Sequence, residues 1–169
     1  VERLHYAKSA TNTGVYTHGL FRIGEDKPIG VAWWLPRTKN AAIATYPEGD
    51  WRKVLSLTRL AIEDFAPKNS ASFLLAASVK LIDASKWNCL VTYADTWRNH
   101  SGAIYKACNW EYLGTTKKSP VFVNQNGMMM GRKRGAKNLT VKEMQEAGFI
   151  KIGEFEKHKF RKLLVKIRA

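Results

Sequence analysis

The pattern of hydrophobic and polar residues is most regular between Leu55 and Gly114, and the other elements are predicted around this stretch. Residues 55–62 are mostly apolar, with Thr58 and Arg59 in the middle. This pattern predicts a strand that is buried on both faces and presents one charge toward its C-terminal end. We therefore expect a binding site where this strand ends.

A helix and a second buried strand are predicted next in the chain. Pro67 breaks the first strand, and a largely apolar segment follows Asn69 or Ser70, either of which can serve as the helix N-cap. The N–H groups in the first turn of such a helix can bind an anion. The second strand is predicted at residues 89–94, and Asp95 follows it directly.

A second helix is predicted after residues 99–102. Its periodicity places Tyr105 on a different face from the residues that point inward. The residues expected to point inward are Ala103, Ile104, Ala107 and Cys108.

Three hairpins are predicted outside this central stretch. Residues 15–23 and 28–35 alternate as two antiparallel strands, and residues 121–130 form a hairpin around an Asn-Gly turn. Residues 149–155 and 159–167 are expected to form a last hairpin that closes the sheet.

One helix is predicted within the C-terminal third, where Thr140 and Glu143 form a capping box and Gly148 ends the helix. The predicted fold class is therefore α/β, with a mixed, partly antiparallel central sheet flanked by helices. Residues 1–169 are expected to form one domain, with a hairpin–helix insert at residues 114–148.

Charge changes this picture because the formal net charge is +14 over 169 residues. Residues 115–169 hold 14 Lys and Arg against 4 Asp and Glu, so most of the excess lies in the last third. A folded domain with such a basic region favours a polyanionic partner. We interpret the 114–148 insert as a candidate clamp on double-stranded DNA. The residues predicted to contact DNA are Arg132, Lys133, Arg134, Lys137, Trp33 and Trp34. Two Trp side chains on a strand more often belong to the core, which is the alternative for both.

Cysteine content and hydropathy exclude several classes of protein. Cys89 and Cys108 lie in apolar patterns, which predicts core thiols and neither a disulfide framework nor a zinc site. No apolar run is long enough to span a membrane, and the sequence does not start with a signal-peptide pattern. We therefore expect no membrane partner and a cytoplasmic location. The sequence leaves the oligomeric state open, and a homodimer is compatible with it.

The central stretch resembles the central half of the GCN5-related N-acetyltransferase (GNAT) fold. The resemblance rests on the order of its elements, which is strand, helix-opening turn, strand and helix, and on the sequence of residues 105–110. In that superfamily the turn binds the pyrophosphate of acetyl-coenzyme A, and a Tyr at the position of Tyr105 protonates the leaving thiolate. The turn here, residues 66–71, has no glycine. The resemblance implies acetyl-coenzyme A or a related acyl donor. It implies cofactor binding by Lys68, Asn69, Ser70, Ala71 and Ser72.

The amino-acid sequence is similar to that of the phage-encoded Mom family over most of the chain, and the similarity is strongest between Leu57 and Lys118. These segments include LTRL, APKNSAS, VTYAD and HSGAIYKACNWEYLG. The resemblance implies a transferase that adds a carbamoylmethyl (acetamido) group to N6 of adenine in phage DNA, in a bacterial host cell, and so protects the DNA from restriction. It also implies a role for His5, because the family carries a His-Tyr pair there.

Four residues are the predicted catalytic set: Tyr105, Asp95, Arg59 and His5. A tyrosine hydroxyl can give a proton to a leaving group, and a carboxylate can accept one from an amine. Arg59 needs a partner in a buried strand, and Asp95 or a ligand phosphate could supply it. Tyr105 could also be an ordinary helix tyrosine, and Asp95 a turn carboxylate. His100 is a weaker candidate in the loop after Asp95.

Metal chemistry and two other functions stay open. His5, Asp95 and Tyr105 could bind a ferrous ion, although their spacing does not support it, so no metal site is predicted. The alternative function is an acetyl-coenzyme A-dependent N-acetyltransferase that acts on a protein or a small amine. A third hypothesis is a DNA-binding protein that keeps the fold without catalysis.

Overall fold

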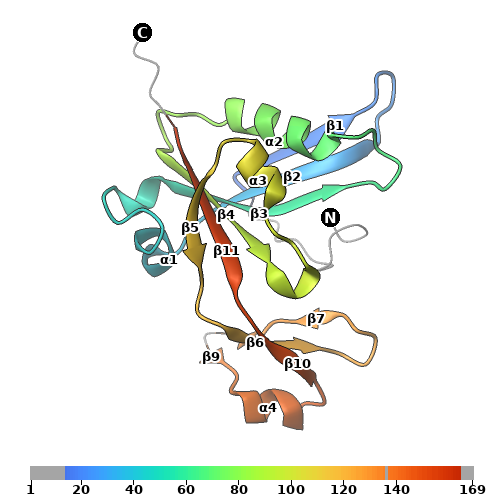
Figure 1. Cartoon of the computed structure of the whole chain (residues 1–169), viewed down its shortest axis with the longest axis vertical. Coiled ribbons are helices and arrows are strands. Elements are labelled where there is room, and N and C mark those ends of the chain that lie inside the picture. The colour runs from blue at the N-terminus through green and yellow to red at the C-terminus, as the bar shows by residue number, and fades with distance from the viewer. Residues whose placement is uncertain (1–13, 136, 165–169) are drawn as a thin grey trace.

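The larger of two lobes is built on a six-stranded sheet with the order β1-β2-β3-β4-β11-β5 (Figure 1). The computed structural model describes residues 14–135 and 137–164. The strands are β1 Tyr16–Phe21, β2 Pro28–Pro36, β3 Val54–Ile62, β4 Cys89–Asp95, β5 Glu111–Thr115 and β11 Lys157–Leu163. Only β3 and β4 pair in parallel, and the other neighbours are antiparallel. The predicted mixed sheet is confirmed.

Helices cover both faces of this sheet. Helices α2 (Ser70–Lys80) and α3 (Ala103–Ala107) pack on one face, where Leu55 of β3 meets Leu74 and Leu75 in the main core. The short helix α1 (Lys39–Ile43) and the 3-10 helix η1 (Trp51–Lys53) lie on the other face. There, Val54 packs with Ala42 in a smaller core. Because successive residues of β3 point to opposite faces, the strand is buried on both sides, as its continuous apolar pattern predicts.

The smaller lobe contains a three-stranded sheet with the order β10-β6-β7. Its strands are β6 Ser119–Val123, β7 Met129–Met130 and β10 Ile150–Phe155. Helix α4 (Val141–Glu146) lies beside β10, and the ribbon of β8 (Lys133–Arg134) and β9 (Lys137–Asn138) precedes it. The fully buried side chains of Phe122 and Met144 give this lobe a core of its own.

Two local predictions for the small lobe are confirmed. The loop between β6 and β7 turns at Gly127, where φ is 72°. The Asn124 side chain accepts hydrogen bonds from the backbone N–H groups of Asn126 and Met128. At the start of α4, the Thr140 hydroxyl accepts from the N–H of Glu143, and the Glu143 carboxylate accepts from the N–H of Thr140.

The predicted last hairpin is wrong. Strands β10 and β11 are separated only by Glu156 and run on in the same direction, from the small sheet into the large one (Figure 1). No Gly or Asn is present at this junction to reverse the chain. Strand β11 inserts between β4 and β5, so the two lobes are joined by one nearly continuous strand and by residues 116–118.

The predicted orientation of α3 is also wrong. Tyr105 points into the core, with ring centroids 5.2 Å from Phe160 and 5.8 Å from Trp110, while Ala103 and Ala107 are exposed. Burying the large aromatic ring removes more apolar surface from water than burying two alanines.

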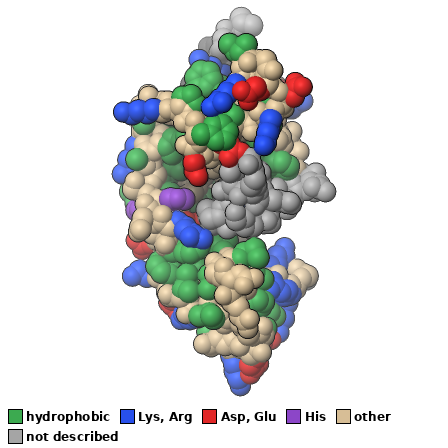
Figure 2. All heavy atoms as spheres, turned by 90° about the vertical axis from the view of Figure 1, so that its right-hand side faces the viewer, with side chains coloured by type: hydrophobic (Ala, Val, Ile, Leu, Met, Phe, Trp, Pro, Cys, Tyr) green, Lys and Arg blue, Asp and Glu red, His purple; other side chains and the backbone are tan. Residues whose placement is uncertain are grey.

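The surface of the small lobe carries an apolar face, which Figure 2 shows from the right-hand side of Figure 1. Met128, Ile150 and Ile152 are exposed large hydrophobic side chains of this lobe. Within the part of the chain that the structure describes, no helix is long and apolar enough to cross a membrane.

Candidate active site

Strands β3 and β4 diverge at the centre of the large sheet. They pair only over Val54–Ser56 and Cys89–Val91, so the two strands separate beyond these residues. The pairing of β3 with β2 also shifts by one residue, because Trp33 faces Arg59 while Trp34 faces Leu57. Thr58 is the extra residue of this bulge, and its hydroxyl donates to the carbonyl of Trp33 at 3.1 Å. Bulges bend a strand and redirect side chains, often beside active sites.

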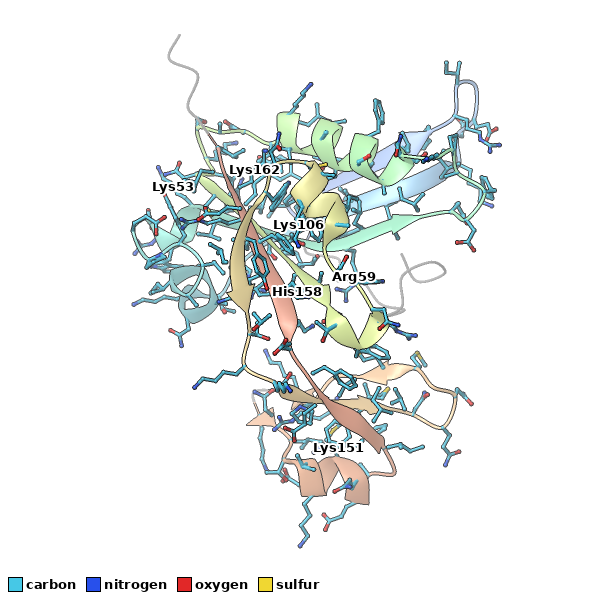
Figure 3. All side chains as sticks on the ribbon, viewed as in Figure 1. Lys53, Arg59, Lys106, Lys151, His158 and Lys162 are labelled. Carbon is cyan, nitrogen blue, oxygen red and sulfur yellow. The ribbon has the colours of Figure 1, made fainter. Side chains whose placement is uncertain are left out.

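A cavity of about 750 Å³ lies where the two strands diverge. We call it the cleft cavity. Residues 57–62 of β3, Thr92–Ala94 of β4 and residues 98–105 line it. The last segment, the β4–α3 loop and the start of α3, contributes Arg98, His100 and Tyr105. Figure 3 shows Arg59 between β3 and the segment after β4.

Tyr105 is a buried phenol at the wall of the cleft cavity. Its exposed fraction is 8%. Burial raises the pKa of Tyr105, and this effect exceeds that of a side-chain hydrogen bond with Thr92, which lowers it. Thr92 in turn lies close to Leu57, whose carbonyl accepts from the Thr92 hydroxyl at 3.3 Å. The hydroxyl of Tyr105 therefore keeps its proton at neutral pH and can act only as a proton donor or a neutral hydrogen-bonding group.

A second cavity of about 440 Å³ lies at the junction of the two lobes. We call it the waist cavity. Its lining residues come from Arg37 directly after β2, from β3 and β4, from the link between β5 and β6, from the start of β6, and from β11. It shares four lining residues with the cleft cavity, namely Leu57, Thr58, Arg59 and Tyr93. The two cavities therefore adjoin at the diverging strands and share one wall.

Asp95 is the carboxylate of the waist cavity. It ends β4 with an exposed fraction of 3%. The Nζ atom of Lys157 lies 2.5 Å from its Oδ1 atom, across the antiparallel pairing of β4 and β11. A buried carboxylate needs a compensating charge, and Lys157 supplies one.

Arginine side chains also border the waist cavity. The guanidinium of Arg37 lies over the ring of Tyr93, 5.0 Å from the centroid, and donates to the Tyr93 hydroxyl at 3.3 Å. Arg59 is half-buried and donates to the carbonyl of Thr58 at 2.7 Å, and burial lowers the pKa of its guanidinium. Lys117 lines the same cavity. The cavity therefore carries more positive than negative side chains.

The residues predicted to bind a cofactor lie at the start of α2, and none of them lines the cleft cavity. Asn69 occupies the N-cap position at φ 70°, the left-handed conformation that glycine usually provides. The hydroxyls of Ser70 and Ser72 donate to the carbonyls of Pro67 and Asn69. Lys68, Asn69 and Ser70 border a separate cavity of about 520 Å³.

The backbone conformation of this turn suits binding of the anionic part of an acyl donor such as acetyl-coenzyme A. Asn69 keeps the left-handed position without a glycine. The N–H groups of Ala71 and Ser72 belong to the first helical turn, where amides point away from the helix, and Lys68 adds one positive charge.

The prediction that Trp34 contacts DNA is wrong. Its side chain is fully buried and stacks on Trp110 at 6.4 Å between centroids. Its indole N–H donates to the Ser78 hydroxyl at 2.7 Å. Trp33 alternates to the opposite face of β2 and is half-buried, so its contact with DNA stays a prediction.

The basic residues predicted to contact DNA lie together in the β8–β9 ribbon of the small lobe. Arg132 donates to the carbonyl of Leu139, and Arg134 donates to carbonyls of its own loop and lies over the Phe149 ring. Lys137 forms an ion pair with Glu143 at 2.5 Å. Lys133 is exposed.

His5 lies outside the described residues. Among the residues that the structure describes, no group of three His, Cys, Asp or Glu side chains could hold a metal ion.

The sequence did not single out several residues that the structure brings to the site. Lys157 is 62 positions from Asp95 and meets it only through the pairing of β11 with β4. Arg37 and Tyr93 are likewise joined by the sheet. Lys157 falls in the turn of the predicted last hairpin, between residues 149–155 and 159–167, and periodicity does not identify the strand with which it pairs.

Comparison with known proteins identifies relatives in sequence. The sequence model of the Mom protein family matches residues 1–166. The methylcarbamoylase mom of Escherichia phage Mu is 24% identical over 119 residues, which are 68% of this chain and 48% of that protein. The chain therefore spans about half the length of this relative.

Solved structures show the same fold. The ribosomal-protein-alanine N-acetyltransferase from Brucella melitensis superimposes with a TM-score of 0.51 at 15% identity, covering 88% of this chain and 68% of that one. An acetyltransferase of the GNAT family from Streptococcus pneumoniae gives a TM-score of 0.50 at 12% identity, covering 88% and 66%. The chain has a GNAT-like fold.

Proposed function

Because the chain belongs to the Mom protein family, we propose that it is a transferase that adds a carbamoylmethyl (acetamido) group to N6 of adenine in phage DNA and so protects the DNA from restriction. The observation that supports this function is the shared wall of the two cavities, made of Leu57, Thr58, Arg59 and Tyr93. A donor in the cleft cavity and an amine in the waist cavity would meet at the diverging strands.

The waist cavity suits a single base. Adenine N6 is paired inside duplex DNA, so an enzyme that modifies it must first extrude the nucleotide. The volume of about 440 Å³ lies in the range of small-molecule sites, about 300–1,000 Å³. The positive side chains Arg37, Lys117 and Lys157 suit the phosphates on either side of an extruded nucleotide.

Two groups handle protons in this proposal. Asp95 accepts a proton from the N6 amine in the waist cavity. Tyr105 holds a proton at its hydroxyl and gives it to the departing atom of the donor in the cleft cavity. The reaction then consumes one proton and releases one, so the two groups balance. Arg59 lies in the shared wall, where its positive charge stabilises negative charge that develops between them.

The donor is an acetyl-coenzyme A-related compound in which the –CH2–CO–NH2 group is bonded to a leaving group. N6 forms a bond to its methylene carbon as the bond to the leaving group breaks. Acetyl-coenzyme A itself would give an N6-acetyl product. Lys68 and the first-turn amides of Ala71 and Ser72 would hold the anionic part of the donor. Arg98 and His100 would border its reactive end in the cleft cavity.

Mass spectrometry of nucleosides tests the proposal. DNA from bacteria that express the protein should contain a deoxyadenosine species heavier by a carbamoylmethyl group, and DNA from cells with an empty vector should not. An acetylated protein or small amine with unmodified DNA would favour the alternative, an acetyl-coenzyme A-dependent N-acetyltransferase. DNA binding without any modified product would favour the non-catalytic hypothesis.

A further inference from the structure

We propose that an apolar face of the small lobe inserts between the base pairs of duplex DNA, close to the nucleotide that is extruded. We call it the wedge face and define it as Val123 of β6, Met129 of β7, and Ile150 and Ile152 of β10. The inference rests on the proposed function, because it assumes that the protein extrudes a nucleotide from a duplex. It assigns these side chains the role of unstacking one base-pair step.

Strand pairing gathers the wedge face on one side of the small sheet. Val123 is opposite Ile150 on one neighbouring strand and opposite Met129 on the other, and side chains directly opposite each other in antiparallel strands share a face. Phe122, the residue before Val123, points to the other side and is fully buried. Ile152 lies at a bulge of β10, two positions after Ile150.

The two isoleucines of the wedge face are open to solvent. Ile150 is 54% exposed and Ile152 is 40% exposed, although isoleucine is among the residues most often buried in folded proteins. Figure 2 shows hydrophobic side chains gathered on this lobe. A contiguous exposed apolar surface marks a place where a partner binds.

Positive side chains predominate in the same lobe. Residues 116–156 carry 8 Lys and Arg against 4 Asp and Glu. Three of these acidic side chains pair with a lysine of the lobe, as Glu146 does with Lys142 in an exposed pair on α4. The guanidinium of Arg134 lies 5.6 Å from the ring centroid of Phe149, the residue before β10. Positive charge therefore lies next to the wedge face.

This charge decides which partner suits the wedge face. A polyanion is attracted to the lobe, whereas a second copy of the chain carries the same net charge of +14 and is repelled. Duplex DNA combines a polyanionic backbone with a stack of bases, and proteins insert isoleucine, leucine and methionine side chains between such bases. The partner that fits both the charge and the apolar side chains is therefore duplex DNA.

Two strands connect the wedge face to the waist cavity. Strand β6 starts at Ser119, which lines the cavity, and reaches Val123 four residues later. Strand β10 leads from Ile150 toward Lys157, which also lines the cavity. At a rise of about 3.3 Å per residue, Val123 lies about 13 Å from Ser119, which is the length of about four base-pair steps. The wedge face is therefore close enough to act on the duplex beside an extruded nucleotide.

Insertion has a measurable effect on the shape of the DNA. Extruding a base costs stacking energy, and apolar side chains that contact the exposed faces of the neighbouring bases offset part of this cost. A side chain inserted in this way kinks the duplex by about 20° to 90°. Phosphate contacts alone need no unstacked step. The kink therefore separates a wedge from a surface that binds only the DNA backbone.

The experiment measures bending and affinity together, with no donor present, on short duplexes that carry a FRET pair at their two ends. The wild-type protein should raise the FRET efficiency, because a kink brings the ends closer. The double variant Ile150→Ser, Ile152→Ser should leave FRET at the value of free DNA and bind about 10-fold more weakly. Its slope of log affinity against log salt should equal that of the wild type, because no phosphate contact is lost.

The matched control is Ile43→Ser, which changes an isoleucine of 42% exposure on α1 in the large lobe. It should bend and bind DNA as the wild type does. The wild-type measurement by itself tests the inference, so the result does not depend on a variant that folds. Unchanged FRET with the wild type, or equal FRET with the wild type and the double variant, would overturn the inference.

Two further outcomes separate the inference from its alternatives. A dimer of the free protein in sedimentation, lost in the double variant while DNA bending persists, would assign the wedge face to a second copy and overturn the inference. Kinked DNA without any modified deoxyadenosine in cells would contradict the proposed function and leave the wedge face supported. Modified deoxyadenosine with straight DNA would support the proposed function and overturn the wedge face.

Discussion

The surroundings of Tyr105 restrict the protonation state of its hydroxyl. It is packed against Phe160 and Trp110 and borders the cleft cavity. Desolvation disfavours the phenolate, so the pKa of Tyr105 rises above its ordinary value of 10. The residue is therefore a donor of protons across the whole physiological range.

The raised pKa predicts a loss of stability at high pH. Above pH 10, the unfolded chain releases the proton that the folded chain keeps, so the free energy of unfolding falls as pH rises through this range, and the contribution is fully present below it. Urea unfolding measured from about pH 9 to pH 11 should show a steeper loss for the wild type than for Tyr105→Phe. Equal slopes would contradict the burial of an ionisable phenol.

Cys89 gives a second prediction at this scale. Its thiol is fully buried and burial raises its pKa to about 12, whereas Cys108 is only partly buried. Because the thiolate is the reactive form, iodoacetamide at pH 8 should alkylate Cys108 first and Cys89 only after unfolding. Peptide mass spectrometry measures the alkylation of each cysteine. Alkylation of both thiols at the same rate would contradict the burial of Cys89.

The elements differ in how far the sequence predicts them. Strands β3 and β4 and the cap of α4 follow from local patterns, because apolar runs and capping residues act within the element itself. The continuation of β10 into β11 does not, because β11 is fixed by pairing with β4 and β5. The face of α3 was missed because a helix of 5 residues is too short to establish a periodicity.

The β4–α3 loop gives a prediction at the scale of elements. Gly102 has φ 72°, and a Cβ atom there would lie 2.3 Å from the Phe160 ring. We expect Gly102→Ala to lower the free energy of unfolding by more than about 1 kcal/mol, through backbone strain and a clash. Gly114→Ala is the matched control, since φ is 81° there but no atom lies within 4 Å.

Urea denaturation of both variants separates the two contributions. Both variants place an alanine in a left-handed backbone conformation, so this strain lowers the free energy of unfolding in each. The difference in the free energy of unfolding between Gly102→Ala and Gly114→Ala therefore measures the clash with Phe160. Equal stability of the two variants would mean that the loop does not pack on Phe160.

At the scale of the whole molecule, the site is an assembly of distant segments. Sequence motifs predicted Tyr105 and Asp95 as candidate site residues, because each follows a recognisable strand or turn, and each of them lines a cavity. They could not locate Lys157 or Arg37, because these residues reach the waist cavity through strand pairing and through the junction of the lobes. Trp34 was misplaced because a tryptophan beside a basic loop has the same sequence pattern in a core and in a binding surface.

The positive charge of the small lobe allows a test of the proposed contact with DNA. Lys133 is exposed in the β8–β9 ribbon, whereas its neighbours Arg132 and Arg134 bind carbonyl groups. Lys133→Glu should weaken DNA binding and lower the slope of log affinity against log salt by about one unit, the effect of one lost phosphate contact. Lys80→Glu, an exposed change on α2, should leave the slope unaltered. If the two variants behave alike, the small lobe is not the DNA clamp.

The central claim is that Asp95 and Tyr105 serve one transfer to adenine from two adjoining cavities. The most direct measurement is the amount of modified deoxyadenosine in DNA from cells that express the wild type, Asp95→Asn, Tyr105→Phe or Lys142→Met at equal levels. We expect a carbamoylmethyl species in the wild type and the Lys142 control, and a loss of about 10²- to 10⁴-fold in each of the other two. Modification within about threefold of the wild type in both site variants, a margin far smaller than a lost proton-transfer group produces, would contradict the account.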